Sequence, residues 1–355
     1  MKKVFVNGYG SIGSRIAQFI KDDPDIKVIG VGKYSPDQEV NTAISRGFDV
    51  YVPQKKLGLF KEYKIAGTIE NALDDCDLVF DASPGGYGYQ NKKNLYEPKG
   101  LMAIYQGGET VYGENAVSDL LFNSRANHTQ AFGKKHVMQG SCNVTGIGRI
   151  LQPLREKFGN RILRFDVVLV RRWADLEQTD KAVVDTIEWK EHPHHGDDVK
   201  SYMGKDIPLF LRAIKVPTRQ MHLHIMDIRF KDSAPKSSEI LQIFKNENGV
   251  ATLWTAKGTK EIRDYANTMN FSFKDTNMIH IHANMAESIG DTVKIMYSDD
   301  QTGIVIPENH MLMQAMLFQR EYDKAFKHTE ELFHMKEKKK ALEDHFAQKN
   351  SSNIV

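Results

Sequence analysis

The sequence has 355 residues, a length that suggests two domains rather than one. A hydrophobic content of 41% is sufficient for packed cores, and a net charge of +2 gives no strong attraction to nucleic acid or membranes. Two cysteines, Cys76 and Cys142, make no disulfide framework and fit a reducing compartment. With no signal peptide and no apolar run long enough to cross a bilayer, we expect a soluble, cytoplasmic protein.

A glycine pattern near the N-terminus lies between two strand-like segments. Residues 3–7 indicate a short buried strand, residues 26–31 indicate the next, and an amphipathic helix separates them. The loop after the first strand has the spacing of a dinucleotide-binding fingerprint. Gly8 makes the turn, Gly10 lets the backbone approach a pyrophosphate, and Gly13 lets helix and strand pack closely. The pattern predicts a nucleotide site, and a tight turn without a ligand is the alternative.

The end of the second strand bears on the choice of cofactor. NAD sites usually carry an acidic residue there, which binds the ribose 2′-hydroxyl. No carboxylate stands at this tip, although Asp37 follows shortly, and Lys33 and Ser35 can hold a 2′-phosphate. We therefore expect NADP to be accepted, with NAD as a second cofactor. An ordinary solvated lysine is the alternative for Lys33.

Helical and strand patterns alternate up to about residue 140. This predicts an α/β fold with an N-terminal doubly wound Rossmann domain over residues 1–140, whose cofactor crevice is lined by loops at 83–86 and 106–109. The further segments are helices at 39–46 and 69–74 and strands at 78–81, 101–105 and 137–138.

Longer strands and fewer helices follow, without strict alternation. We expect an α+β catalytic domain over residues 141–302 with a mostly antiparallel or mixed sheet. Its segments are strands at 163–170, 183–189, 211–216, 222–230 and 278–282 and helices at 238–244 and 260–267. Residues 311–347 indicate one long helix or two, and residues 350–353 a frayed end.

The polar stretch around Cys142 is the main candidate for chemistry. An amphipathic helix follows it, with apolar residues at 144, 147, 151, 154 and 158. Cys142 would thus lie at the helix N-terminus, where unpaired N–H groups and the helix dipole favour an anion. We expect the thiol to ionise readily and to act as a nucleophile. The polar neighbours Ser141, Asn143 and Thr145 argue against the alternative, a buried core cysteine.

Thirteen histidines raise the question of a metal. Pairs such as His222 and His224 share one face of a strand, but the sequence has no HExxH, no CxxC and no carboxylate at a suggestive spacing. We therefore expect no metal site. A thiolate nucleophile needs a base, and spacing alone leaves His194, His195 and His222 as candidates without ranking them.

Together these motifs resemble the archaeal-type (type II) phosphorylating glyceraldehyde-3-phosphate dehydrogenases. The resemblance covers most of the chain and is specific because the motifs occur together and in this order. They are Val6–Gly10, Ser141–Asn143, Val170–Arg172, His194–Gly196, Val216–Thr218 with Met221–His222, and Gln301 before Ile306–Asn309.

The resemblance implies a reaction and a set of roles. The enzyme would oxidise glyceraldehyde 3-phosphate with inorganic phosphate and NADP or NAD, in glycolysis or gluconeogenesis, as a cytoplasmic homotetramer. Cys142 would attack the aldehyde, with His222 as general base. Since the family returns its last helix to the cofactor domain, residues 303–355 would belong there. The resemblance further implies substrate contacts from Ser141, Asn143, His194 and His195, and cofactor contacts from Ser11, Ile12, Gly108, Arg172 and Gln301.

Some residues depart from the family pattern. Val144, Trp173 and Asp197 replace the usual Thr, Gly and Pro, and the tail after Glu331 is longer. Two other functions remain open: a related cysteine-dependent semialdehyde or acyl-phosphate dehydrogenase, and a catalytically silent dinucleotide-binding protein. The lysine-rich cluster at 336–340 is more typical of a solvated helix face than of a nucleic-acid site.

Overall fold

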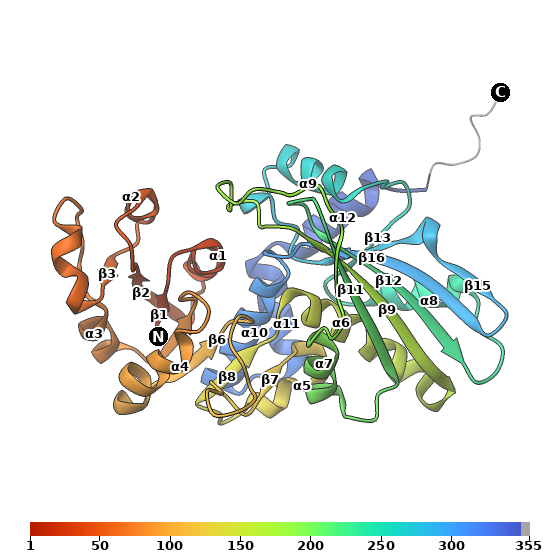
Figure 1. Cartoon of the computed structure of the whole chain (residues 1–355), viewed down its shortest axis with the longest axis horizontal. Helices are drawn as coiled ribbons and strands as arrows, with labels where there is room; N and C mark the ends of the chain where they lie inside the picture. The colour runs from red at the N-terminus through yellow and green to blue at the C-terminus, as the bar shows by residue number, and fades with distance from the viewer. Residues whose placement is uncertain (349–355) are drawn as a thin grey trace. The chain divides into compact units, whose positions relative to one another are not determined.

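The computed structural model describes residues 1–348, so the frayed end expected at residues 350–353 lies outside the described part. The chain forms two compact units (Figure 1). Unit 1 contains Met1–Ser141 and Ile306–Phe333, and unit 2 contains Cys142–Val305 and the described residues from His334 on. Within residues 1–348, no helix combines the length and the apolar character that crossing a membrane requires.

Unit 1 is built on an eight-stranded sheet in which every pairing is parallel. The strand order is β4-β3-β2-β1-β5-β6-β8-β7, so the order reverses beside β1, as in doubly wound folds. The predicted Rossmann architecture is confirmed. The strands are β1 (Lys2–Asn7), β2 (Ile26–Gly32), β3 (Val50–Val52), β4 (Gly67–Thr68), β5 (Leu78–Asp81), β6 (Met102–Tyr105), β7 (Leu121–Phe122) and β8 (His136–Gln139).

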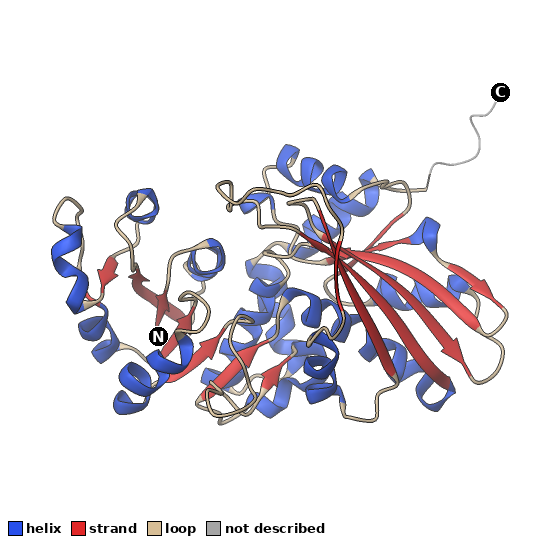
Figure 2. Cartoon of the chain, in the orientation of Figure 1, coloured by secondary structure: helices blue, strands red, loops and turns tan. Residues whose placement is uncertain are grey.

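Five of the α-helices of unit 1 lie between these strands in the sequence (Figure 2). They are α1 (Ser11–Ile20), α2 (Gln38–Ser45), α3 (Ile69–Ala72), α4 (Gly88–Asn91) and α5 (Ser124–Asn127). Val4, Phe5 and Val6 of β1 are fully buried, as expected for a central parallel strand. Ile16 and Ile20 of α1 are buried too, which explains the apolar face seen in the sequence.

Unit 2 contains a mixed sheet of order β10-β11-β9-β12-β16-β14-β13, with β15 paired to β16. The expected mixed sheet is confirmed, but the segment predicted as a strand at 183–189 contributes only β10, and β16 was not predicted. The strands are β9 (Ile162–Arg172), β10 (Glu188–Lys190), β11 (Leu209–Val216), β12 (His222–Phe230), β13 (Val250–Leu253), β14 (Ile279–His282), β15 (Glu287–Ile289) and β16 (Thr292–Asp299). The helices are α6 (Cys142–Phe158), α7 (His195–Met203), α8 (Ser237–Asn246), α9 (Thr259–Thr268) and α12 (Met335–His345).

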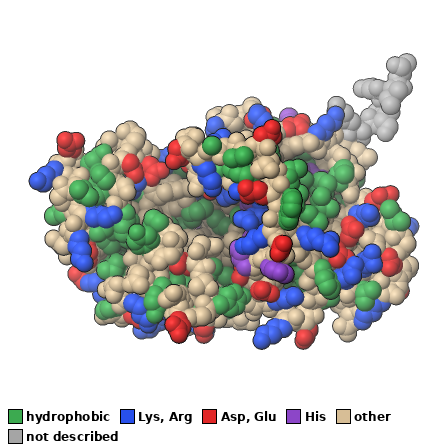
Figure 3. Space-filling view, viewed as in Figure 1, with side chains coloured by type: hydrophobic (Ala, Val, Ile, Leu, Met, Phe, Trp, Pro, Cys, Tyr) green, Lys and Arg blue, Asp and Glu red, His purple; other side chains and the backbone are tan. Residues whose placement is uncertain are grey.

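The two faces of this sheet differ. Along β12, His222, His224 and Met226 are buried, and α6 packs on the neighbouring strands β9 and β16. On the other face Ile225 is 38% exposed and Phe210 of β11 is 57% exposed. Figure 3 shows hydrophobic and charged side chains side by side over unit 2. The sheet therefore has one packed face and one open face with large apolar side chains.

The C-terminal part contains α10 (Val305–Phe318), α11 (Tyr322–Leu332) and α12, rather than one or two helices. Gln319 and His334 have positive φ values of 48° and 53°, which interrupt the helical path. Helices α10 and α11 belong to unit 1, whereas α12 belongs to unit 2. This differs from the expected placement of all of 303–355 with the first domain. The physical reason is burial, because Leu342 and Phe346 join the core of unit 2.

Polar contacts attach α10 to unit 1. Oε2 of Glu308 accepts a hydrogen bond from the backbone N–H of Ser124 at 2.7 Å. Nε2 of His310 lies 2.7 Å from Oδ2 of Asp23, and burial lowers the pKa of His310. The neutral ring therefore donates to a buried carboxylate, and these contacts fix the helix that follows the last strand.

Candidate active site

Cys142 is the first residue of α6, as the sequence predicted. Strand β8 ends at Gln139, and only Gly140 and Ser141 separate it from the helix. The residues that follow, such as Val144 and Ile147, are buried and hold the helix against the sheet. Cys142 is partly buried as a residue, and the packing of α6 places its sulfur at the helix N-terminus.

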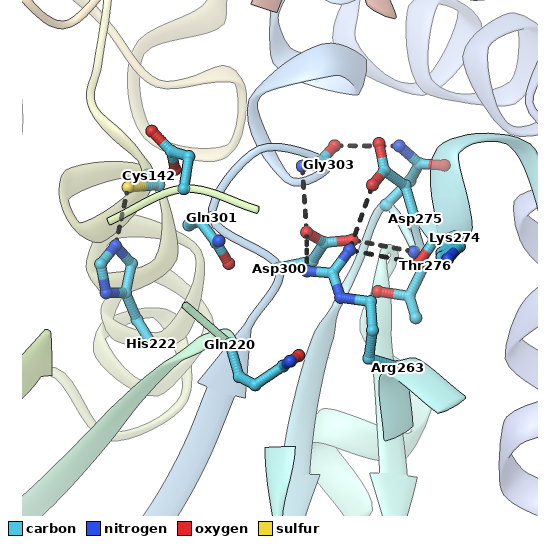
Figure 4. A network of polar contacts seen from close by, with 12 residues as sticks. Cys142, Gln220, His222, Arg263, Lys274, Asp275, Thr276, Asp300, Gln301 and Gly303 are labelled. Carbon is cyan, nitrogen blue, oxygen red and sulfur yellow. Dashed lines mark hydrogen bonds and ion pairs between the residues drawn. The ribbon is translucent and has the colours of Figure 1, made fainter. Parts of the chain in front are cut away.

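His222 meets this sulfur from the opposite element. It is the first residue of β12, and its Nε2 lies 3.1 Å from Sγ of Cys142 (Figure 4). The structure thus brings together the predicted nucleophile and one of the three candidate bases. The other two, His194 and His195, lie at the start of α7.

The tautomer of His222 follows from its second nitrogen. The backbone N–H of Arg172 donates to Nδ1 at 3.2 Å. Burial, followed by the nearby Arg172 cation, holds the pKa of His222 well below its usual range, so the ring is neutral and carries one proton. Because Nδ1 is an acceptor, that proton lies on Nε2 and points toward the sulfur. In this tautomer His222 can stabilise a thiolate.

The ionisation of Cys142 differs from the expectation. Burial raises the pKa of the Cys142 thiol to about 12, and Asp299 acts in the same direction. Arg172 and Arg171 lower the pKa but do not offset the burial. The helix N-terminus therefore does not make the thiol acidic in the ligand-free chain, and a thiolate must be stabilised by hydrogen bonds within the site.

His224 and Asp299 lie beneath the first turn of α6. Both are buried, and the sequence analysis did not assign either of them to this site. Nε2 of His224 is 3.0 Å from Oδ1 of Asn143, and 3.6 Å from Oδ2 of Asp299. Asp299 pairs directly with His222 across β12 and β16. The His222–His224 spacing was a usable signal, since both share one strand face, but Asp299 could only be found by recognising β16.

Cationic groups surround the two loop histidines. His194 and His195 stack with ring centroids 4.2 Å apart. Burial lowers both pKa values, that of His195 to about 2, and Arg171 and Lys190 lower them further. Arg171 also acts on the Cys142 thiol, and its buried Nε has no hydrogen-bond partner within residues 1–348. Arg171 is therefore the best placed of the cations considered for an anionic ligand.

Arg219, another candidate for binding an anion, is already engaged. Its Nη2 donates to the carbonyl oxygen of Lys181 at 2.6 Å, and its Nε to that of Gln178 at 3.4 Å. Arg172 likewise pairs with Asp175 at 2.5 Å. These contacts rank both arginines below Arg171 as anion ligands.

A buried ionic network holds the turn that carries Gln301 (Figure 4). Nη2 of Arg263 donates to Oδ1 of Asp300 at 2.8 Å, and the backbone N–H of Thr276 donates to Oδ2 at 3.0 Å. Nε2 of Gln301 donates to the carbonyl oxygen of Arg219 at 3.3 Å, while its buried Oε1 lacks a partner among residues 1–348. Gln301 is therefore held in place with one polar atom unused.

In unit 1 the predicted glycines occupy the loop from β1 to α1. Gly8 has φ +116°, and a Cβ there would lie 2.3 Å from the Ala82 carbonyl oxygen. A Cβ at Gly13 would lie 1.8 Å from the Gly8 carbonyl oxygen, so helix and strand pack as closely as predicted. A Cβ at Gly10 would meet no atom of the described chain within 4 Å. The loop thus has open space in front of the N-terminus of α1, where Ser11 and Ile12 begin the helix.

The other unit 1 residues follow neighbouring strands. Gly108 follows β6, and a Cβ at Gly85 would lie 3.5 Å from its carbonyl oxygen, so the loops after β5 and β6 meet. Lys33 follows β2 and is buried, and its Nζ contacts Asp37 at 2.8 Å and Glu39 at 2.9 Å. Lys33 is therefore not a free cation at the strand tip, because two carboxylates share its ammonium group.

A dinucleotide-type parallel sheet and a thiol–imidazole pair in one chain define a class of protein, the oxidoreductases that use a cysteine nucleophile. Comparisons with curated proteins identify the family. The chain is 35% identical to a glyceraldehyde-3-phosphate dehydrogenase of Methanothermus fervidus over 326 residues, 89% of this chain and 94% of that one. It is 32% identical to the enzyme of that name from Sulfolobus acidocaldarius over 338 residues, 93% of this chain and 96% of the relative.

A third relative, from Methanobacterium formicicum, carries the same name and is 34% identical over 328 residues, 89% of this chain and 94% of the relative. No protein-family model matches the chain. The chain belongs to the archaeal-type glyceraldehyde-3-phosphate dehydrogenase family.

The raised pKa of Cys142 predicts how the alkylation rate of its thiol depends on pH. Since the neutral thiol predominates below a pKa of about 12, alkylation of the ligand-free protein by iodoacetamide should accelerate about tenfold per pH unit between about pH 7 and about pH 10. Peptide mass spectrometry would follow the label on Cys142, with Cys142→Ser as the control that reports Cys76 alone. A rate that levels off below about pH 8 would contradict the raised pKa.

Proposed function

We propose that this protein catalyses the phosphorylating oxidation of D-glyceraldehyde 3-phosphate to 1,3-bisphosphoglycerate, and the reverse reaction, with a nicotinamide dinucleotide. The observation that carries the proposal is the 3.1 Å contact between Sγ of Cys142 and Nε2 of His222 at the N-terminus of α6. The names of the relatives support the substrate.

The glycine loop of unit 1 fits the pyrophosphate of such a cofactor. Open space in front of Gly10 and the N-terminus of α1 provide room and N–H donors for an anion. The unit 1 residues that would hold the cofactor are Gly8, Gly10, Ser11, Ile12, Gly13 and Gly108. The family resemblance also assigns cofactor contacts to Arg172 and to Gln301, whose buried Oε1 is unused. When bound, the nicotinamide accepts the hydride that the oxidation releases.

The residues of unit 2 perform the covalent chemistry. The Cys142 thiol loses its proton to solvent, and the thiolate adds to the aldehyde carbon; a C–S bond forms as the carbonyl oxygen takes the Nε2 proton of His222 and becomes the hydroxyl of a thiohemiacetal. His222, 3.1 Å from the same sulfur, takes the hydroxyl proton as the C–H bond breaks, which leaves a thioester on Cys142. Inorganic phosphate then attacks the thioester carbon, and the thiolate departs from the acyl phosphate.

The charged end of the substrate requires a cation and N–H donors. Arg171, with its unpartnered buried Nε, would supply the charge, and the neutral rings of His194 and His195 would donate N–H groups to the phosphate group. Ser141 and Asn143 flank the nucleophile in the sequence and would contact the reacting end. The stretch from Ser141 to Asn143 would thus place the aldehyde carbon at the sulfur.

Cys142→Ser should remove nearly all turnover and leave cofactor binding intact, because the hydroxyl is a far weaker nucleophile. The assay follows reduced cofactor formed from glyceraldehyde 3-phosphate, with and without phosphate, and fluorescence titration measures cofactor binding. Strict phosphate dependence supports the proposed reaction over a non-phosphorylating oxidation. Faster turnover of an amino-acid semialdehyde would favour the related dehydrogenase, and no turnover of any aldehyde by the wild type would favour a silent cofactor-binding protein.

His222→Asn should slow the hydride step by about 10²- to 10⁴-fold if His222 is the base. This test separates a base from a mere N–H donor. In the resting tautomer Nε2 carries a proton, which it must release before it can accept another. Single-turnover stopped-flow at saturating substrate isolates the step. A loss smaller than about tenfold would show that an N–H donor suffices at this position, and His194→Asn and His195→Asn would then test the remaining candidate bases.

For the cofactor we propose that both NADP and NAD are accepted, with Lys33 holding the 2′-phosphate. Asp37 and Glu39 compete for the same ammonium group, so their charges oppose NADP. Lys33→Asp should weaken NADP far more than NAD. Asp37→Asn with Glu39→Gln should strengthen NADP relative to NAD, because Asn retains the helix-capping role of Asp37 without the charge. Equal changes in KM for both cofactors would remove Lys33 from cofactor choice.

The open face of the unit 2 sheet supports the proposal of a homotetramer. Val168, Phe210 and Ile225 line a groove of about 520 Å³ on that face, with charged residues such as Arg212 and Asp227 around them. A sheet face of this kind is suited to contact with another copy of the chain. Sedimentation analysis of the protein in solution would measure the mass of the assembly and so test whether it contains four copies of the chain. A nucleophilic thiol must also stay reduced, which supports a cytoplasmic location.

A further inference from the structure

His224 has no role in the proposed reaction, yet it lies two residues from the proposed base and is fully buried. His222 and His224 point to the same face of β12, toward the first turn of α6. The side chain that His224 meets there is Asn143, whose Oδ1 is 3.0 Å from Nε2. The other amide atom of Asn143, Nδ2, is 3.8 Å from Sγ of Cys142. One side chain thus connects His224 to the reacting sulfur.

The position of the proton on His224 fixes the direction of these contacts. Burial lowers the pKa of His224 to about 3, so the ring is neutral and has one N–H. Nε2 faces two oxygens, Oδ1 of Asn143 at 3.0 Å and Oδ2 of Asp299 at 3.6 Å. Nδ1 is buried without a hydrogen-bond partner in residues 1–348. The proton therefore belongs on Nε2, because on Nδ1 it would be a buried donor without an acceptor.

The opposite orientation of the Asn143 amide is less favourable on both sides. Nδ2 would then donate to Nε2 of His224, which would move the ring proton to the unpartnered Nδ1. Oδ1 would then face Sγ of Cys142, where a neutral thiol could still donate its S–H but a thiolate would meet only oxygen lone pairs. The reactive form of the cysteine would therefore be repelled. The orientation with Nδ2 toward the sulfur is therefore the one that His224 selects.

We propose that His224 is a positioning residue, which holds the Asn143 amide so that its N–H donates to the Cys142 thiolate. This inference rests on the proposed function and deepens it by assigning the second donor of the site. With Nε2–H of His222 on one side and Nδ2–H of Asn143 on the other, the sulfur has two donors that offset the cost of burying its charge. When the thiohemiacetal forms and negative charge moves from the sulfur to the oxygen, the Asn143 N–H can donate to that oxygen.

Asp299 explains why His224 donates to Asn143 and not elsewhere. Oδ2 of Asp299 lies 3.6 Å from Nε2 of His224, whereas Oδ1 of Asn143 lies 3.0 Å away, and burial, with Asp300 next, raises the pKa of Asp299 well above its usual range, so the amide oxygen is the better acceptor for the Nε2 proton. The Asp299 carboxyl group is also confined, since a Cβ at Gly146 would lie only 2.7 Å from its Oδ2. Asp299, Arg172, Asp175 and Arg171 act electrostatically on the thiol, His222 contacts it, and all five remain in the His224 and Asn143 variants below.

The test measures the Cys142 thiol itself, without substrate or cofactor. His224→Phe keeps a ring of similar size and removes the donor, whereas His224→Gln retains an N–H near the position of Nε2. We expect His224→Phe to lower the iodoacetamide alkylation rate at about pH 8.5 by about tenfold or more, the size expected for a lost hydrogen bond to a charged group. His224→Gln should stay within about threefold of the wild type. Equal rates for His224→Phe and the wild type, or equal losses in both variants, would overturn the proposal.

Asn143→Asp provides a second variant in case the ring replacement impairs folding. It keeps the oxygen that accepts from His224 and replaces the donor to the sulfur by another oxygen, so alkylation should slow at least as much as in His224→Phe. Thermal melting and circular dichroism confirm that each variant is folded. An unchanged rate in folded Asn143→Asp would refute the donor role. Because alkylation needs no aldehyde, failure of the proposed enzyme activity would leave this result readable.

Discussion

The contact between Sγ of Cys142 and Nε2 of His222 requires the first residue of a helix to meet the first residue of a strand. Helix α6 must begin at Cys142, and β12 must begin at His222. The register of the sheet secures the second condition, since β12 pairs with β9 on one side and β16 on the other. A shift of one residue would turn His222 to the open face and bring Leu223 beneath the helix. The chemistry therefore depends on the order of the sheet that lies under α6.

Burial shapes this site in two opposing ways. It keeps His222 and His224 neutral and fixes which nitrogen of each carries the proton, through contacts with Arg172 and Asn143. The same burial raises the pKa of Cys142, so the thiolate is not the resting state. Donors placed around the sulfur recover part of that cost when the charge forms. The site is thus arranged for the charged form, while the ligand-free chain holds the neutral one.

The elements that carry the nucleophile and the base were both predicted. Apolar residues at helical spacing predicted α6, and residues 222–230 were predicted as a strand with the bounds that β12 has. Strand β16 was not predicted, although Val293, Ile295 and Tyr297 alternate along it with more exposed residues; its last two residues, Ser298 and Asp299, are polar and yet buried. Without β16, Asp299 could not be placed opposite His222. Buried polar residues at a strand end do not extend its hydrophobic pattern, so the position of Asp299 inside the core could not be inferred from sequence.

Tertiary contacts decided two further features that sequence could not show. Lys33 was predicted as a cation for a 2′-phosphate, but contact with both Asp37 and Glu39 appears only once α2 is folded beside it. The C-terminal segment was placed with the first domain, yet it divides at His334, and Leu342 packs into unit 2. Both depend on which surfaces meet in space, and this is absent from local spacing.

Trapping the covalent intermediate tests the central claim most directly. The protein is mixed with glyceraldehyde 3-phosphate and oxidised cofactor in the absence of inorganic phosphate, quenched in acid and digested for peptide mass spectrometry. The account predicts one acyl group per chain, on the peptide that contains Cys142, which disappears when phosphate is added before the quench. Oxidation that proceeds with Cys142 unmodified, or with the acyl group on another residue, would contradict it.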